Sequence, residues 1–308
     1  MEEYVSVRNT QAQNYIKTPL YILNENTGYV LYKAADKKLD KNQFSKDNSP
    51  NLYISKNDKE SATDELRKEL KKKLIKNIET GNLYEVKNEI CEIVNEVFSG
   101  AVEQSIEMLP ETIDIIYDSY SDISDLLRGF SDIHYAGYPL INHSVNVMTL
   151  TLLYCLKNGF EEHETKRITL CALLHDIGVT KLKKGILSYP GRLSDQLYNE
   201  YKAHASIGHD IVKTSENIDS SIAIGILEHH ERLDGSGYPR GIANITFEGR
   251  LVGLINSFDQ LTNSEKLHRH KKKPFDAMMV IKNEVMEKGQ FDKALFKNLC
   301  LSLGRKLS

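Results

Sequence analysis

Apolar residues follow two different spacings along this 308-residue chain. In the first 60 residues they form short runs rich in Tyr, Val and Ile, such as Tyr21–Leu23 and Tyr29–Tyr32, which turn-forming segments such as Asn24–Asn26 separate. Short runs of this composition between turn residues are typical of β-strands. The pattern therefore predicts a small strand-containing module at the amino terminus.

Further along the chain, apolar positions recur every three or four residues, which is the spacing of amphipathic helices. Predicted helices begin near Ala62 and Leu83 and then cover 113–127, 145–156, 165–174, 195–212, 222–228, 249–261, 274–286 and 294–303. Because 308 residues exceed what one hydrophobic core usually serves, we expect two unequal domains. The prediction is a mainly α protein, with a helical domain over residues 101–308 and a smaller α+β module with a helical linker over residues 1–100.

Composition limits the partners and the location that we expect. The net charge is −3, so no overall basic field attracts duplex nucleic acid or an anionic membrane. The amino terminus lacks the basic-then-apolar order of a signal peptide, and the apolar stretch Met148–Leu156 is too short to cross a bilayer. The four cysteines have no paired spacing and are interpreted as free thiols. We expect a cytoplasmic protein that binds neither duplex nucleic acid nor membrane.

Histidine is confined to the second part of the chain, because all ten histidines lie at or after His134. Four segments, spaced 25 to 32 residues apart, carry the candidate metal ligands His143, His175, Asp176, His204, His229 and His230. Each interval is about one helix plus its connection, which is how a helical bundle directs ligands to its interior. Imidazole and carboxylate suit divalent metals, and six such groups exceed the needs of one ion once water takes its share. The sequence therefore predicts two metal ions.

Asp176 is the candidate bridge between these ions, because a carboxylate has two oxygens and can offer one to each. It follows His175 at the end of an apolar helix, which we expect Gly178 to stop. After His229 and His230, a glycine-rich stretch cannot continue the helix, so we expect a loop to leave the second metal ion.

Taken in order, these segments resemble the HD-GYP family of metal-dependent cyclic di-GMP phosphodiesterases. The matching segments, within about residues 135–305, are His143–Ser144, His175–Gly178, Pro190–Leu193, His204 with Gly208, His229–Glu231 and Asp234–Pro239. The resemblance implies a helical HD fold and two divalent metal ions, iron or alternatively manganese, at which a metal-bound hydroxide cleaves a 3′–5′ phosphodiester of cyclic di-GMP. It also implies that the loop residues Gly237, Tyr238 and Pro239 contact cyclic di-GMP synthase domains. Residues 1–100 carry no part of the resemblance and are interpreted as a regulatory or interaction module.

Three departures from the family pattern surround the predicted metal ions. Val179 replaces the lysine that follows the His-Asp-Ile-Gly run, so Lys181 becomes the candidate catalytic and phosphate-binding cation beside Asp176. Asn256 stands at the place of a metal-binding aspartate, and its amide oxygen is a further candidate ligand. The family's Arg-Pro-Tyr-Arg stretch has lost its tyrosine, and Lys266 and Arg269 remain as candidate phosphate-binding residues.

The departures leave a second function open, namely a degenerate family member that senses cyclic dinucleotides or binds proteins without turnover. The complete histidine set favours the phosphodiesterase, whereas Val179, Asn256 and the missing tyrosine favour the sensor. An HD phosphohydrolase for another nucleotide is disfavoured by the Gly-Tyr-Pro loop. Some family members hold a third metal ion, but residues 115–120 offer only Asp118 and no histidine, so two ions are favoured over three.

Overall fold

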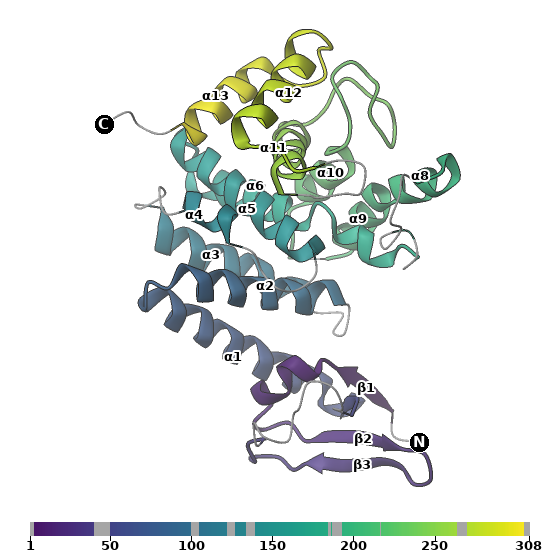
Figure 1. Cartoon of the computed structure of the whole chain (residues 1–308). Coiled ribbons are helices and arrows are strands. Elements are labelled where there is room, and N and C mark those ends of the chain that lie inside the picture. Colours follow the sequence, from purple (N-terminus) through teal and green to yellow (C-terminus); the bar gives the residue numbers. More distant parts are fainter. Residues whose placement is uncertain are drawn as a thin grey trace. The chain divides into compact units, whose positions relative to one another are not determined.

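The computed structural model describes residues 3–39, 50–99, 105–121, 127–133, 139–183, 186, 193–215, 217–263 and 270–304. The chain divides into two compact units, Met1–Leu109 and Pro110–Ser308, which Figure 1 colours along the sequence. The expected fold class, mainly α with a strand-containing amino-terminal part, is confirmed. The domain boundary expected after residue 100 stays a prediction.

The amino-terminal unit contains a four-stranded antiparallel sheet in the order β1-β4-β2-β3. The strands are β1 (Tyr4–Val7), β2 (Leu20–Asn24), β3 (Gly28–Lys33) and β4 (Leu52–Ser55). The predicted turn joins β2 to β3, where the Asn24 side chain accepts hydrogen bonds from the backbone N–H groups of Asn26 and Thr27. Gly28 follows with a φ of +78°, a conformation that favours glycine. Leu52 and Ile54 of β4 are buried.

Two helices, α1 (Lys59–Glu79) and α2 (Leu83–Ser99), complete this unit together with the short 3₁₀ helix η1 (Asn9–Asn14). A chain of polar side chains links η1 to both helices. Arg8, just before η1, forms ion pairs with Glu92 and Glu96 of α2, at 3.1 and 3.3 Å. Gln11 also donates to Glu92, at 2.9 Å. Asn14 donates to Gln11, and Lys73 of α1 donates to Asn14, which connects the network to α1.

The helical unit is built around α5, whose side chains from Ser144 to Cys155 are all buried. Its helices are α3 (Met108–Tyr120), α4 (Leu127–Asp132), α5 (Pro139–Lys157), α6 (Glu162–Leu174), α8 (Asp195–Lys202), α9 (His204–Lys213), α10 (Ser220–Glu228), α11 (Phe247–Asn263), α12 (Pro274–Met286) and α13 (Lys293–Leu303). A 3₁₀ helix, η6 (Ile177–Lys181), follows α6. α5 packs against α4, α6, α11 and α13. No helix among the described residues is long and apolar enough to cross a membrane.

Two helix predictions are corrected. The segment 195–212 forms two helices, α8 and α9, and not one. The His204 ring bonds to the backbone oxygen of Tyr201 at 2.7 Å, an oxygen that a continuous helix would use for its own ladder, and apolar spacing does not reveal this competition. The segment predicted to be helical to residue 127 stops at Tyr120, and α4 begins at Leu127.

Candidate metal centre

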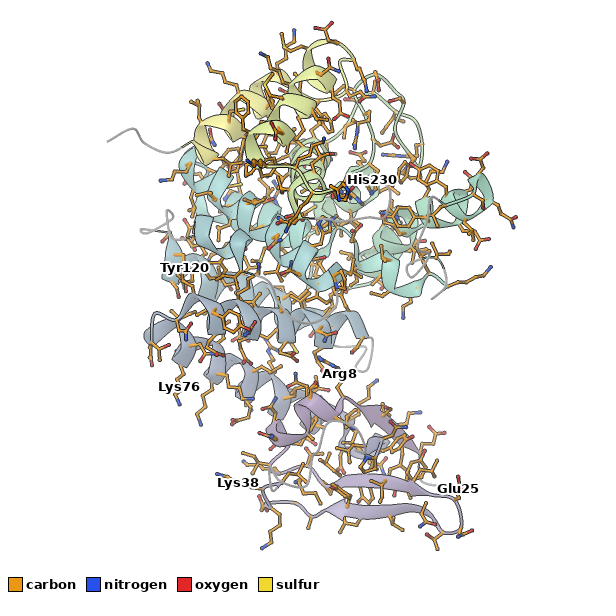
Figure 2. The ribbon with its side chains drawn as sticks, viewed as in Figure 1. Arg8, Glu25, Lys38, Lys76, Tyr120 and His230 are labelled. Atoms are coloured by element: carbon orange, nitrogen blue, oxygen red, sulfur yellow. The ribbon has the colours of Figure 1, made fainter. Side chains whose placement is uncertain are left out.

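The structure brings the six predicted ligands together inside the helical unit. His143 lies on α5, His175 and Asp176 follow α6, His204 begins α9, and His229 and His230 follow α10. All except His143 are buried. Figure 2 shows His230 in the interior of this unit. The ligand atoms form two groups, each within 4.8 Å: Asp176, His204, His229 and His230 in one, and His143, His175 and Asp176 in the other.

Asp176 belongs to both groups and divides its oxygens between them. Its Oδ1 lies 3.3 Å from His204 Nε2 and 3.6 Å from His229 Nε2. Its Oδ2 lies 3.4 Å from His175 Nε2 and 3.6 Å from His143 Nε2. The carboxylate is therefore oriented as a bridging ligand would be.

Backbone carbonyls fix the tautomers of three imidazoles. The Nδ1 atoms of His175, His204 and His229 lie 2.6 to 2.7 Å from carbonyl oxygens three residues earlier. A carbonyl oxygen only accepts, so each Nδ1 carries the proton and each neutral ring keeps its lone pair on Nε2. This protonation leaves every one of the three Nε2 atoms available as a metal ligand.

The lone pairs point at other acceptors. Among the described residues, Nε2 of His204, His229 and His230 and Oδ1 of Asp176 are buried without a hydrogen-bond partner. Burying acceptors against one another is costly. A cation between them would convert this repulsion into coordination, so the residues fit a metal ion.

Burial also sets the charge of the cluster. It lowers the pKa of His204, lowers that of His229 to about 4, and lowers that of His230 well below its usual value. These rings are therefore neutral at pH 7, which is the form that binds metals. The cluster thus presents neutral imidazoles to the Asp176 carboxylate.

A second carboxylate, Asp259 of α11, orients His143. Its Oδ2 lies 2.6 Å from His143 Nδ1, and its Oδ1 accepts a hydrogen bond from Asn263 at 2.7 Å. Burial lowers the pKa of His143, but Asp259 outweighs this effect and raises it. Carboxylates that hold the far nitrogen of a metal-binding histidine are common in metal sites. Asp259 was not among the predicted site residues, although its spacing of three residues from Asn256 places both on one helix face.

Asn256 is buried one turn earlier on α11 and forms a side-chain hydrogen bond with His143. Its Oδ1 also accepts from Gln260 at 2.8 Å. A carbonyl oxygen has two lone pairs, so a metal ion would replace one of these two bonds. Ligation by Asn256 stays a prediction.

The loop after His230 is held against the centre. The Tyr238 ring stacks on the His230 ring with centroids 4.5 Å apart, and the Tyr238 N–H donates to the His230 carbonyl at 3.2 Å. Buried Glu231 accepts the backbone N–H groups of Arg240 and Ile242 at 2.7 and 3.1 Å. At Gly237 a Cβ would lie 2.4 Å from Arg232 N, so glycine is required there.

These features agree with known proteins. Residues 130–295, more than half of the chain, match the HD domain family. The chain belongs to the HD domain family. Its motifs and relatives identify it as a divergent HD-GYP member.

Several curated relatives are named as phosphodiesterases of cyclic dinucleotides. The cyclic di-GMP phosphodiesterase response regulator RpfG of Xanthomonas campestris is 37% identical over 109 residues, which cover 34% of this chain and 29% of that protein. A cyclic di-GMP phosphodiesterase of Thermotoga maritima is 28% identical over 185 residues, or 58% and 50% of the two chains. A 3′3′-cGAMP-specific phosphodiesterase of Vibrio cholerae is 30% identical over 158 residues, or 50% and 36%. The match thus spans half or less of each relative.

A solved structure has the same fold. It is the HDG"Y"P protein Bd1817 of Bdellovibrio bacteriovorus, with a TM-score of 0.60, 19% identity and coverage of 96% of this chain and 98% of that one. The agreement extends over both the strand-containing part and the HD domain.

Other predicted site residues of this HD domain are less defined. Lys181 ends η6 with an exposed side chain, and the described residues include no hydrogen-bond or ion-pair partner for it. Val179 is buried. Lys266 and Arg269 lie outside the described residues. The substrate-binding roles of Lys181, Lys266 and Arg269 stay predictions.

The glycine after the His-Asp pair serves packing and not helix termination. Gly178 does not have a positive φ, so the expected left-handed stop is absent. A Cβ there would lie 2.0 Å from the His204 carbonyl oxygen and 2.5 Å from Gly208 N. Glycine lets η6 approach α9 closely and thereby brings His204 to Asp176.

Proposed function

We propose that this chain is a cyclic di-GMP phosphodiesterase that holds two divalent metal ions, iron or manganese. The observation that supports this most directly is Asp176, whose two oxygens face two separate groups of imidazole nitrogens. One ion would take Oδ1 with His204, His229 and His230. The other would take Oδ2 with His143, His175 and Asn256. The names of several relatives support the cyclic dinucleotide as the substrate.

Two ions fit the residues better than three. Asp118, the acidic group offered for a third ion, has a largely exposed side chain that faces Lys166 at 3.7 Å. The same Lys166 pairs with Asp114 at 3.0 Å and Glu162 at 2.7 Å. An ammonium group therefore already lies where a cation bound by these carboxylates would lie.

The chain's own groups have distinct tasks in the proposed reaction. Two bound ions would supply an acidified water and would stabilise charge on the phosphoryl oxygens. Asp176 positions both ions, and Asp259 holds the His143 ring in place. The Tyr238 ring covers His230 and limits the access of water to that side. Lys181, Lys266 and Arg269 would bind phosphate oxygens.

A second function, a cyclic-dinucleotide sensor without turnover, is favoured by two observations. Val179 is buried and uncharged where the family has a lysine, and Asn256 is neutral where the family has an aspartate. Both changes reduce the charge that would stabilise a phosphoryl transition state.

One experiment separates these functions. Protein purified without oxygen is analysed for metal and incubated with cyclic di-GMP and, separately, with 3′3′-cGAMP. Metal with release of linear pGpG from cyclic di-GMP supports the phosphodiesterase. Metal with binding but no product supports the sensor. His204→Ala is the control, because it should lose bound metal and activity together.

Three further expectations belong to this proposal. The loop of Gly237, Tyr238 and Pro239 would contact cyclic di-GMP synthase domains, and Pro239 is exposed as such a contact requires. The amino-terminal unit would regulate the enzyme or bind a partner. A cytoplasmic location stays a prediction.

A further inference from the structure

Helix α8 buries none of its side chains. Ser194 caps it by accepting the N–H of Leu197, and Glu200 pairs with Lys183 at 3.1 Å. Figure 1 shows α8 at the margin of the helical unit. A helix that contributes so little to the hydrophobic core needs another reason for its two tyrosines.

These tyrosines extend the ring contacts of the metal centre outward. The Tyr201 ring lies 4.8 Å from the His204 ring, and the Tyr198 ring lies nearly parallel to Tyr201 at 6.5 Å. Tyr198 also meets Tyr238 edge to face at 6.3 Å. Tyr198 is therefore one ring removed from the ligands His204 and His230.

The outermost ring is accessible and has a positive charge over one part of it. Tyr198 is 44% exposed, and the Lys202 ammonium lies over its ring, 5.2 Å from the centroid. An exposed ring beside a cation is what binds nucleotides without a base-specific hydrogen bond, because the base stacks and the cation meets phosphate. In a nucleotide one sugar separates the base from the phosphate, and one ring separates Tyr198 from the metal centre. A base that stacks on Tyr198 would therefore place its phosphate near the centre.

We propose that Tyr198 is a specificity-determining residue that stacks on a nucleobase of the cyclic dinucleotide. The proposal deepens the proposed function and rests on it. Tyr201 supports the Tyr198 ring, and Lys202 binds the adjacent phosphate. Tyr198 does not contact the reacting phosphodiester, so it acts on substrate affinity and not on the chemical step.

The test compares Tyr198→Ala and Tyr198→Phe with Phe275→Ala, which removes another exposed ring, 74% exposed, on α12. Each full-length protein is assayed by equilibrium binding of cyclic di-GMP and by kinetics on cyclic di-GMP and on an abasic ribose phosphodiester. Tyr198→Ala should raise KM and Kd for cyclic di-GMP about tenfold, as expected for one stacked base. Its kcat, its metal content and its rate with the abasic substrate should not change. Tyr198→Phe should restore binding, and Phe275→Ala should resemble the wild type.

The outcomes separate this proposal from the proposed function. If the wild type hydrolyses cyclic di-GMP and Tyr198→Ala leaves KM unchanged, or weakens both substrates equally, the stacking role is wrong while the phosphodiesterase stands. If the wild type binds without hydrolysis and Tyr198→Ala weakens binding, the stacking role stands and the phosphodiesterase fails. A wild type that neither binds nor hydrolyses cyclic di-GMP overturns both.

Discussion

Among the described residues, each unit holds a cluster of polar side chains with buried members, and the hydrogen-bonding groups of the two clusters are satisfied in opposite ways. In the amino-terminal unit, donors meet acceptors along the chain from Lys73 through Asn14 and Gln11 to Glu92, which also receives Arg8. In the helical unit, acceptors meet acceptors, because imidazole Nε2 atoms face the oxygens of Asp176.

The difference shows what each cluster is for. The first is completed by the protein alone, apart from Glu96 Oε1, and stabilises the packing of η1 on α1 and α2. The second leaves four ligand atoms without partners among the described residues, an arrangement that fits a cation. Metal removal should therefore affect the second cluster alone. Four substitutions test this contrast, in order of decreasing effect.

Asp176→Asn should remove both ions, because the amide keeps the shape but loses the charge and one of the two acceptor oxygens. His204→Ala should chiefly loosen the ion beside Oδ1. Metal analysis of the purified variants measures this. Equal metal loss from the two variants would argue against the bridge.

Asp259→Asn should lower the affinity for the ion held by His143 and His175 by about 10–100-fold, as substitutions of other carboxylates that bond to a metal-binding histidine do. The other ion should stay bound. Competition with a metal-sensitive dye gives both affinities. The matched control is Asp210→Asn, because Asp210 pairs with His209 at 2.9 Å on the surface, away from the predicted ligands. A similar loss in the control would mean that the effect is not local.

Arg8→Ala should lower the free energy of unfolding by about 3 kcal/mol at pH 8 without changing metal content, because it leaves Glu96 buried without its cation. Burial already raises the pKa of Glu96, and Arg8 opposes that rise. Without Arg8 the pKa of Glu96 rises further. Between the ordinary glutamate pKa and this raised pKa, the folded variant keeps a proton on Glu96 that the unfolded chain has already released. The loss should therefore shrink toward pH 5. Denaturant unfolding at both pH values checks this, and adding Glu96→Gln should restore part of the stability.

Glu89→Gln should have the smallest effect and the opposite sign. Burial raises the pKa of Glu89 to about 7, and its Oε1 has no partner among the described residues. Its ionisation therefore costs stability as pH rises from the unfolded value of 4.5 through 7. The amide should add about 1–2 kcal/mol at pH 8 and little at pH 4.5. A gain that is equal at both pH values would exclude ionisation as the cause.

Much of the fold was predictable because apolar spacing reports which helix faces are buried. Helix 274–286 was predicted with its observed ends, since Pro274 marks the start. The division into α8 and α9 was not predictable, because it depends on a hydrogen bond from the His204 ring to Tyr201.

The six side chains that cluster around Asp176 were also predictable. The order of His143, the His175–Asp176 pair, His204 and the His229–His230 pair is unusual and matches one family. The role of Asp259 and the ring contacts of Tyr198 depend on which helix faces meet, and spacing along one chain does not specify that. Gly178 was read as a helix stop, whereas close packing against His204 explains it.

The central claim is that the acceptor-lined cluster around Asp176 holds two metal ions. The most direct test is the metal content of the full-length protein, purified without oxygen and measured by mass spectrometry against protein concentration. The account predicts close to two ions of iron or manganese per chain, with Asp176→Asn reduced to the background. One zinc ion per chain, or no metal at all, would contradict it.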